Sequence, residues 1–331
     1  MFIFDQILRP MIRVGVIGAG HLGKIHLKLL AENPKYNLIG FFDTNTETSE
    51  VLATNNGYRY YSSIDELLGQ IDAACIVTPT PFHFEVAQKA INYGVHLLIE
   101  KPITTSVNQA YQLVKDAREK NLIGVVGHVE RFNPAYSAAI SYIKEPKFIE
   151  IHRLAEFNPR GNDVSVILDL MIHDIDILLQ MVKSKITSID ANGAAVVSSS
   201  PDIASARIAF ENGCVANLTA SRISLKNMRR TRLFQKDAYI TIDFLAKKTE
   251  VVRIKEAPEN PEPFDMILQT AEGEKKQIYF ESPETTEVNA IAEEHNDFAL
   301  AIEGSKEPNV SFEHGAKALE VAQAIIDKLE F

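Results

Sequence analysis

The residues whose types and spacing suit chemistry begin with three glycines that follow a short apolar run, namely Gly18, Gly20 and Gly23. The run, residues 12–17, has the length of a buried strand, and the apolar periodicity of a helix begins at Leu22. A second apolar run, residues 38–42, ends at Asp43, about 20 residues after the last glycine. This order of strand, glycine turn, helix, strand and acid predicts a dinucleotide-binding unit. The glycine spacing by itself is weaker evidence, because it also occurs by chance.

Each part of this turn has a physical task. Gly18 permits the tight turn, Gly20 lets a pyrophosphate approach the backbone, and Gly23 lets the helix pack closely on the sheet. The backbone N–H groups at the start of the helix, at His21 and Leu22, together with the helix dipole, then face the phosphates.

Asp43 bears on which dinucleotide is bound. A carboxylate at the end of the second strand accepts hydrogen bonds from the ribose hydroxyls of the adenosine. Its charge repels a 2′-phosphate, and Thr44 and Asn45 offer no cation to hold one. The sequence therefore favours NAD over NADP.

A lysine follows another strand-like segment. Glu100, Lys101 and Pro102 stand directly after an apolar run, and ligands bind at the carboxyl ends of strands in open α/β sheets. Lys101 there is placed to hydrogen-bond a reacting hydroxyl or carbonyl oxygen. The alternative is an exposed lysine at a strand end.

A nearly all-apolar helix predicted over residues 166–180 carries one polar stripe. Asp169, His173, Asp176 and Gln180 recur at helical spacing, and burying such groups without partners is costly. Asp169 is placed to orient the His173 imidazole while the imidazole handles a proton. The alternative is a satisfied ion-pair network with no catalytic part.

The elements that must position these residues come in two kinds. Up to about residue 130, apolar strands alternate with helices, which predicts a doubly wound parallel sheet covered on both faces. Later segments are longer and alternate in polarity, which predicts a mostly antiparallel sheet with one face on helices. The strands expected there are residues 148–151, 203–210, 214–219 and 239–244, and helices are expected at 288–303 and 312–329.

The predicted fold class is therefore α/β, with a cofactor domain at 11–130 and an α+β domain at 131–331 whose last helix can pack back on the first domain. Residues 1–10 are expected to form an N-terminal arm. The second sheet needs a cover for its other face, which predicts a homodimer or homotetramer.

Composition narrows the class of protein. The chain is 46% hydrophobic and 24% charged, with a net charge of −10, which suits a globular protein and argues against a nucleic-acid partner. No apolar stretch reaches the roughly 20 residues that cross a bilayer, so no membrane association is expected. Cys75 and Cys214 form no metal pattern, and this cysteine usage suits a reducing cytoplasm.

The chain resembles the Gfo/Idh/MocA oxidoreductases along essentially its whole length. The resemblance rests on the glycine turn, on Glu100-Lys101-Pro102, and on Asp169 and His173 as the family's D-x-x-x-H. It implies an N-terminal Rossmann domain, a C-terminal open sheet that commonly forms the oligomer interface, and NAD(P)-dependent oxidation or reduction of a ring carbon of a sugar or related compound. By the same resemblance Lys101, Asp169 and His173 match the catalytic residues, and no metal is needed.

Two segments, residues 127–134 and 169–176, look like the family members that act on nucleotide-activated amino sugars such as UDP-N-acetylglucosamine. The candidate substrate-binding residues are His128, Arg131, Arg153 and Arg160. The arginines can supply cations for a diphosphate, and the alternative for each is a surface salt bridge.

Other candidate positions border the cofactor by resemblance: Thr78, Pro79, His83, Glu100 and, besides its catalytic role, Lys101. His83 can instead cap or pack a helix. The remaining histidines are isolated in sequence and are expected to be structural or solvated: His26, His96, His152, His295 and His314.

Other functions remain open at this point. An NAD-dependent glycosidase of the same family would release free sugar without net NADH, and a non-catalytic dinucleotide sensor could dispense with the catalytic lysine and histidine. The reduction of a bilin or a dihydrodiol is a further alternative within the enzyme class.

Overall fold

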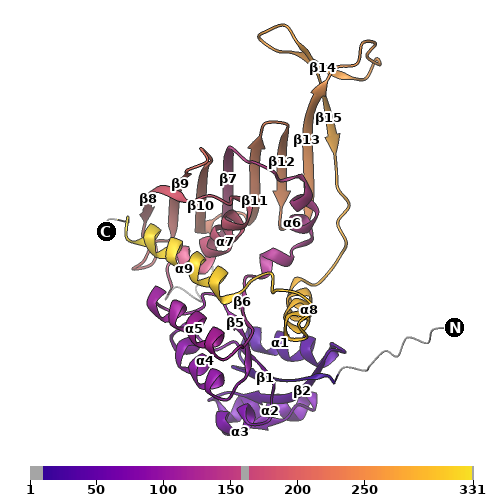
Figure 1. The fold of residues 1–331 in the computed structure, drawn as a ribbon. Coiled ribbons are helices and arrows are strands. Elements are labelled where there is room, and N and C mark those ends of the chain that lie inside the picture. Colours follow the sequence, from indigo (N-terminus) through magenta and orange to yellow (C-terminus); the bar gives the residue numbers. More distant parts are fainter. Residues whose placement is uncertain (1–9, 158–163, 330–331) are drawn as a thin grey trace, which may run out of the picture. The chain divides into compact units, whose positions relative to one another are not determined.

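The computed structural model describes residues 10–157 and 164–329, and the chain divides into two units (Figure 1). The first unit comprises the chain up to His128 together with Ile291–Ala316, and the second comprises Val129–Ala290 and the chain from Lys317 onward. Nine residues of the predicted N-terminal arm, 1–9, lie outside the described residues.

The first unit is built on a six-stranded parallel sheet in the order β3-β2-β1-β4-β5-β6. Its strands are β1 (Ile12–Ile17), β2 (Tyr36–Phe42), β3 (Tyr60–Tyr61), β4 (Ala73–Ile76), β5 (His96–Glu100) and β6 (Gly124–Gly127). Every residue of β4 is buried, as expected for a central strand covered on both faces. The strand order reverses between β1 and β4, which is where ligands bind in open α/β sheets.

Helices connect the strands of this sheet. They are α1 (His21–Glu32), α2 (Thr46–Asn56), α3 (Ile64–Leu68), α4 (His83–Asn92) and α5 (Val107–Glu119), with a 3₁₀ turn η1 (Thr80–Phe82) before α4. The doubly wound parallel sheet predicted from the sequence is confirmed.

One helix of the first unit comes from late in the chain. In α8 (Ala290–Ile302), Phe298 and Ala299 are buried in the same hydrophobic cluster as residues of β1, β2 and α1. The Tyr36 hydroxyl in β2 donates a hydrogen bond to the backbone oxygen of His295, 2.7 Å away. The predicted second domain, residues 131–331, is therefore interrupted, because the apolar face of α8 is buried in the first unit.

The second unit holds a nine-stranded sheet in the order β14-β15-β13-β12-β11-β7-β10-β9-β8. Neighbouring strands are antiparallel except the pair β7 and β10, so the mostly antiparallel sheet is confirmed. The strands are β7 (Phe148–Glu156), β8 (Ile186–Ala194), β9 (Ile203–Phe210), β10 (Val215–Ser224), β11 (Met228–Gln235), β12 (Ala238–Asp243), β13 (Lys248–Glu256), β14 (Met266–Gln269) and β15 (Lys275–Glu281). Figure 1 shows β13 and β15 continuing into a long hairpin that ends at β14.

The core of this unit lies between one face of the sheet and its helices. Alternate residues of β9, such as Ala204, Ala206 and Ile208, are buried against residues of α7 and of the last turns of α9. The helical elements are η2 (Val129–Phe132), α6 (Pro134–Ala139), η3 (Ile140–Tyr142), η4 (Ile167–Met171), α7 (Ile172–Met181) and α9 (Phe312–Ile326). Among the described residues no helix is long and apolar enough to cross a membrane.

Phe298→Ala tests whether α8 is part of the first core. The Phe298 side chain is 2% exposed, so its truncation is expected to lower the free energy of unfolding by about 3–5 kcal/mol through the cavity it leaves. Urea unfolding measures the change. The same substitution at Phe264, which is 95% exposed, serves as the control and is expected to be nearly neutral. Equal stability of the two variants would contradict the assignment of α8.

Candidate active site

The glycine turn between β1 and α1 has the shape that a dinucleotide requires. Gly18 has φ +98°, and a Cβ there would lie 2.7 Å from the backbone of Val77. A Cβ on Gly23 would lie 2.0 Å from the backbone oxygen of Gly18, so the helix packs directly on the turn. A Cβ on Gly20 would meet nothing within 4 Å. The fold thus requires glycine at positions 18 and 23, whereas Gly20 leaves open space above the backbone.

The start of α1 faces that open space. Gly20 is the N-cap residue, no side chain caps the helix, and its first turn has no acidic residue. The first N–H groups of a helix have no partner within the helix, and they carry its positive dipole end. His21 and Leu22, predicted to contact the cofactor, lie in this first turn. These N–H groups and the dipole are sufficient to bind a phosphate at this position.

A cavity of about 570 Å³ opens beside the turn. Its lining joins the ends of β1, β2 and β4: Ile17, Gly18, Gly20, Phe42, Asp43, Thr44, Val77, Thr78, Pro79, Phe82 and Val86. The Asp43 carboxylate is held at the lining by the backbone N–H groups of Ala19 (2.6 Å) and Asn45 (2.8 Å). A carboxylate has about four acceptor positions, so Asp43 can still receive two ribose hydroxyls. These residues fit the adenosine half of a dinucleotide.

His83 braces two loops of the first unit. Its buried ring lies with Nε2 2.8 Å from the backbone oxygen of Thr78 and Nδ1 2.9 Å from that of Pro102. Burial lowers the pKa of His83, and a neutral imidazole has one N–H, so it donates to one of the two carbonyls at a time. Among the predicted cofactor residues, Thr78 and Pro79 line the cavity, whereas His83 holds the backbone around it.

Lys101 stands at the carboxyl end of β5, where the sequence places it. The preceding carboxylate, Glu100, accepts a hydrogen bond from the backbone N–H of Lys101 (3.3 Å) and lies 3.0 Å from Nε2 of His26. A Cβ on Gly127 in the adjacent β6 would come within 3.0 Å of that carboxylate. The Lys101 N–H, the His26 ring and Gly127 thus hold the Glu100 carboxylate in place. These contacts fix the backbone that carries the partly buried Lys101.

Asp169 and His173 lie in the second unit, on a helical segment that is not a single α-helix. Asp169 belongs to the π-helical turn η4, and His173 lies in the first turn of α7. The predicted α-helix over 166–180 is corrected in its first part, because apolar periodicity does not distinguish i→i+4 from i→i+5 hydrogen bonding. Both side chains are partly buried, and π-helical turns occur frequently at functional sites.

The rest of the predicted polar stripe has structural partners. Asp176 is buried and receives two hydrogen bonds from Arg131, at 2.6 and 2.8 Å. Gln180 accepts a hydrogen bond from Lys183. Asp176 and Gln180 thus have identified side-chain partners, and a catalytic role for Asp169 and His173 stays a prediction.

Arg153 is the centre of a second buried ion-pair network. Its guanidinium donates to both carboxylate oxygens of Asp174 at 2.8–3.0 Å and to Glu130 at 2.9 Å. Glu130 also accepts from Arg229, at 3.2 Å. Burial by itself lowers the pKa of Arg153, but the two carboxylates raise it, so the guanidinium stays charged.

These networks show where two of the predicted substrate-binding arginines lie. The side chains of Arg131 and Arg153 are 4% and 3% exposed and form ion pairs with carboxylates, and their role toward a diphosphate stays a prediction. Glu130, which binds two arginines, was not singled out from the sequence. His128 is buried, and Arg160 lies outside the described residues.

Two histidines expected to be isolated are neighbours. Nδ1 of His26 lies 2.9 Å from Nε2 of His295, although 269 positions separate them in the sequence. No local pattern could have revealed this contact, because it depends on where α8 is buried.

The comparisons with known proteins agree with this geometry. The family model for the oxidoreductase family with an NAD-binding Rossmann fold matches residues 12–128, and the GFO/IDH/MocA C-terminal domain model matches residues 111–241. UDP-N-acetylglucosamine 3-dehydrogenase of Acidithiobacillus ferrooxidans is 42% identical over 238 residues, which is 70% of this chain and 74% of that protein. Inositol 2-dehydrogenase of Rhizobium meliloti is 26% identical over 95% of this chain and 96% of that protein.

A solved structure extends the similarity to the whole fold. That of the Acidithiobacillus ferrooxidans enzyme superposes with a TM-score of 0.87 at 34% identity, covering 97% of this chain and 98% of that one. Fold and site together define an NAD(P)-dependent dehydrogenase that acts on CH–OH groups. The chain belongs to the Gfo/Idh/MocA oxidoreductase family.

Gly20→Ala and Gly23→Ala are expected to separate cofactor binding from folding. Gly20 has an extended backbone that alanine adopts freely, so G20A should keep wild-type stability and lose NADH affinity by at least ~10-fold, because its methyl group occupies the phosphate position. G23A should lose about 1–3 kcal/mol of stability as well, because its methyl group overlaps a backbone oxygen. NADH titration and thermal unfolding measure the two effects. Unchanged NADH binding in G20A would contradict the proposed phosphate position.

Arg153→Met tests the structural role of the buried network. Removing the guanidinium leaves Asp174 and Glu130 buried without their main partner, which is expected to cost about 3–5 kcal/mol in urea unfolding. The control is Arg232→Met in the same sheet, whose pair with Glu150 is exposed and worth at most about 1 kcal/mol. An R153M variant as stable as R232M, with weakened binding of a nucleotide sugar, would support the diphosphate role.

Proposed function

We propose that this protein oxidises a secondary hydroxyl of a nucleotide-activated amino sugar, with UDP-N-acetylglucosamine as the leading candidate and its C3 hydroxyl as the reacting group. One observation carries the proposal, namely the 42% identity to a UDP-N-acetylglucosamine 3-dehydrogenase over about three quarters of that protein's length. The presence of Lys101, Asp169 and His173 supports a catalytic role over a purely regulatory one.

The chemistry assigned to the side chains follows from their types. His173 takes the proton of the substrate hydroxyl, and Asp169 holds the imidazole in the tautomer that can accept it. Lys101 donates a hydrogen bond to the same oxygen and stabilises its developing negative charge. Bound NAD supplies the acceptor for the hydride that leaves the alcohol carbon, so the alcohol becomes a ketone. That Lys101 and His173 meet at one alcohol stays a prediction.

The cofactor is held by the first unit. The turn from Gly18 to Gly23 receives the pyrophosphate, and Asp43 receives the adenosine ribose. The carboxylate favours NAD over NADP, because a 2′-phosphate beside it would be repelled.

We further propose a homodimer or homotetramer formed through the nine-stranded sheet. Apolar side chains are exposed on its strands, among them Phe234, Ile254, Met266 and Phe280. A second copy is a cover of suitable shape for an open sheet face. A cytoplasmic location is supported by the two cysteines, which are free and buried, as is usual in reducing compartments.

The function is tested by incubating the full-length enzyme with NAD and UDP-N-acetylglucosamine and following NADH absorbance. Wild type is expected to form NADH, whereas Lys101→Met and His173→Ala should each lower kcat by ~10²–10⁴ with NADH binding retained. The matched controls are Lys115→Met and His152→Ala, which keep wild-type turnover.

Three results would argue against the proposal. Wild-type turnover in both K101M and H173A would remove the mechanism. Release of free sugar without net NADH would indicate the glycosidase alternative. NADH binding without turnover of any UDP-sugar, free sugar or inositol would indicate a dinucleotide sensor.

A further inference from the structure

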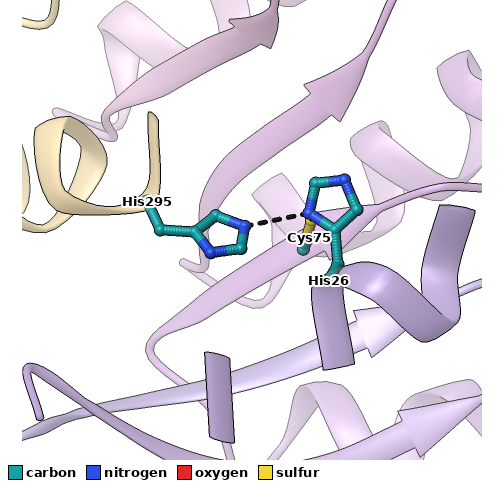
Figure 2. A group of neighbouring side chains, drawn as sticks. All are labelled: His26, Cys75 and His295. Atoms are coloured by element: carbon teal, nitrogen blue, oxygen red, sulfur yellow. Dashed lines mark hydrogen bonds between the residues drawn. The ribbon is translucent and has the colours of Figure 1, made fainter. Parts of the chain in front are cut away.

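A compact cluster of metal-ligand residue types lies inside the first unit, apart from the residues assigned to the reaction (Figure 2). His26 comes from α1, Cys75 from β4 and His295 from α8. Their side-chain nitrogen and sulfur atoms all lie within 4.8 Å of one another, and the three residues are 0%, 2% and 1% exposed. Within the part of the chain that the structure describes, this is the group with such spacing.

The atoms converge on Nδ1 of His26. That nitrogen lies 2.9 Å from Nε2 of His295 and 3.2 Å from Sγ of Cys75. Figure 2 marks the contact between the two rings with a dashed line. The other ring nitrogen of His26, Nε2, lies 3.0 Å from a carboxylate oxygen of Glu100. If Nε2 donates to that carboxylate, Nδ1 carries a lone pair and points it at the other two residues.

Hydrogen bonds alone do not satisfy this cluster. The single lone pair of His26 Nδ1 faces two possible donors, the His295 ring and the Cys75 thiol, and can accept one good hydrogen bond. His295 Nδ1 and both carboxylate oxygens of the adjacent Glu294 are buried without a hydrogen-bond partner among the described residues. Buried polar groups without partners are costly, so hydrogen bonds among these side chains leave part of the cluster unsatisfied.

We propose that His26, Cys75 and His295 bind a divalent transition-metal ion, most suitably Zn²⁺, through these three side chains. Imidazole and thiolate are the ligand types that Zn²⁺ selects. Binding displaces the thiol proton of Cys75, which passes to solvent, and uses both imidazoles in the neutral form.

The geometry needs a small adjustment. At Zn–N distances of about 2.0–2.1 Å and a tetrahedral angle, two ring nitrogens stand ~3.3 Å apart, so those of His26 and His295 would separate by ~0.4 Å. Glu100 supplies what a metal-bound histidine ordinarily has, a carboxylate on its other ring nitrogen.

The site has a structural consequence. It joins three segments that are distant in sequence, and one of them, α8, returns to this unit only after the long segment of the second unit, Val129–Ala290. A metal bound there stabilises the docking of α8 on α1 and β4, because the ligands come together only in the folded unit. The proposal departs from the sequence expectation of no metal, which rested on the lack of metal-ligand spacing along the chain and on the family resemblance.

Metal content and a cobalt spectrum test the site independently of catalysis. Full-length protein, purified without a polyhistidine tag, is expected to contain about one zinc per chain by mass spectrometry of the metal. Protein that is unfolded with chelator and refolded with Co²⁺ should show a thiolate-to-cobalt charge-transfer band. Cys75→Ser should lose the band and the zinc. Cys214→Ser is the matched control, since Cys214 is also buried and free, and it should keep both.

The melting temperature gives a second readout. Refolding with Zn²⁺ should raise it above that of the chelator-treated protein in wild type and C214S, and not in C75S or His295→Asn. If C75S does not fold, H295N and the wild-type comparison decide the question. Wild type without bound zinc and without a cobalt band, or a C75S variant that keeps the band, would overturn the proposal and leave the cluster as a hydrogen-bonded core.

Discussion

The close approach of α1 to the end of β1 is the constraint on which the cofactor half of the molecule depends. The Cα of Gly23 lies so near the backbone oxygen of Gly18 that no side chain fits between them. This contact aims the uncapped start of α1 at the open space above Gly20, and it places Asp43 at the rim of the same cavity. The backbone geometry thus leaves an open space at a helix start that suits phosphates, with one acidic side chain at its rim.

The second unit depends on a different interaction, the pairing of buried charges. Asp174 and Asp176 lie on α7 and would be costly to bury alone, but Arg153 and Arg131 neutralise them through several hydrogen bonds each. These pairs specify how α7 packs on the sheet. His173 lies on the same helix and Asp169 on the π-helical turn before it, so these ion pairs help to position both candidate residues.

Much of this architecture could be predicted from local patterns. The strands that were predicted either alternate apolar and polar residues, as residues 203–210 do, or form continuous apolar runs. Such patterns indicate which faces of a strand must be buried. The strands β8, β11 and β13–β15 were not predicted, because much of their length is polar or exposed, as the exposed Arg229 and Arg230 in β11 illustrate. The π-helical turn at Asp169 escaped prediction because one inserted residue hardly alters an apolar pattern.

The sequence by itself determined the family, the cofactor turn and the catalytic candidates, because these depend on residue types at short, fixed spacings along the chain. The tertiary structure alone decided which charges are neutralised and which segments meet. The sequence shows that Arg131 and Arg153 are cations, and only the fold shows that they are buried beside Asp176 and Asp174. His26 and His295 became neighbours only because α8 buries Phe298 in the first core. Contacts of that kind follow from where apolar faces are buried over hundreds of residues, and no spacing in the chain records them.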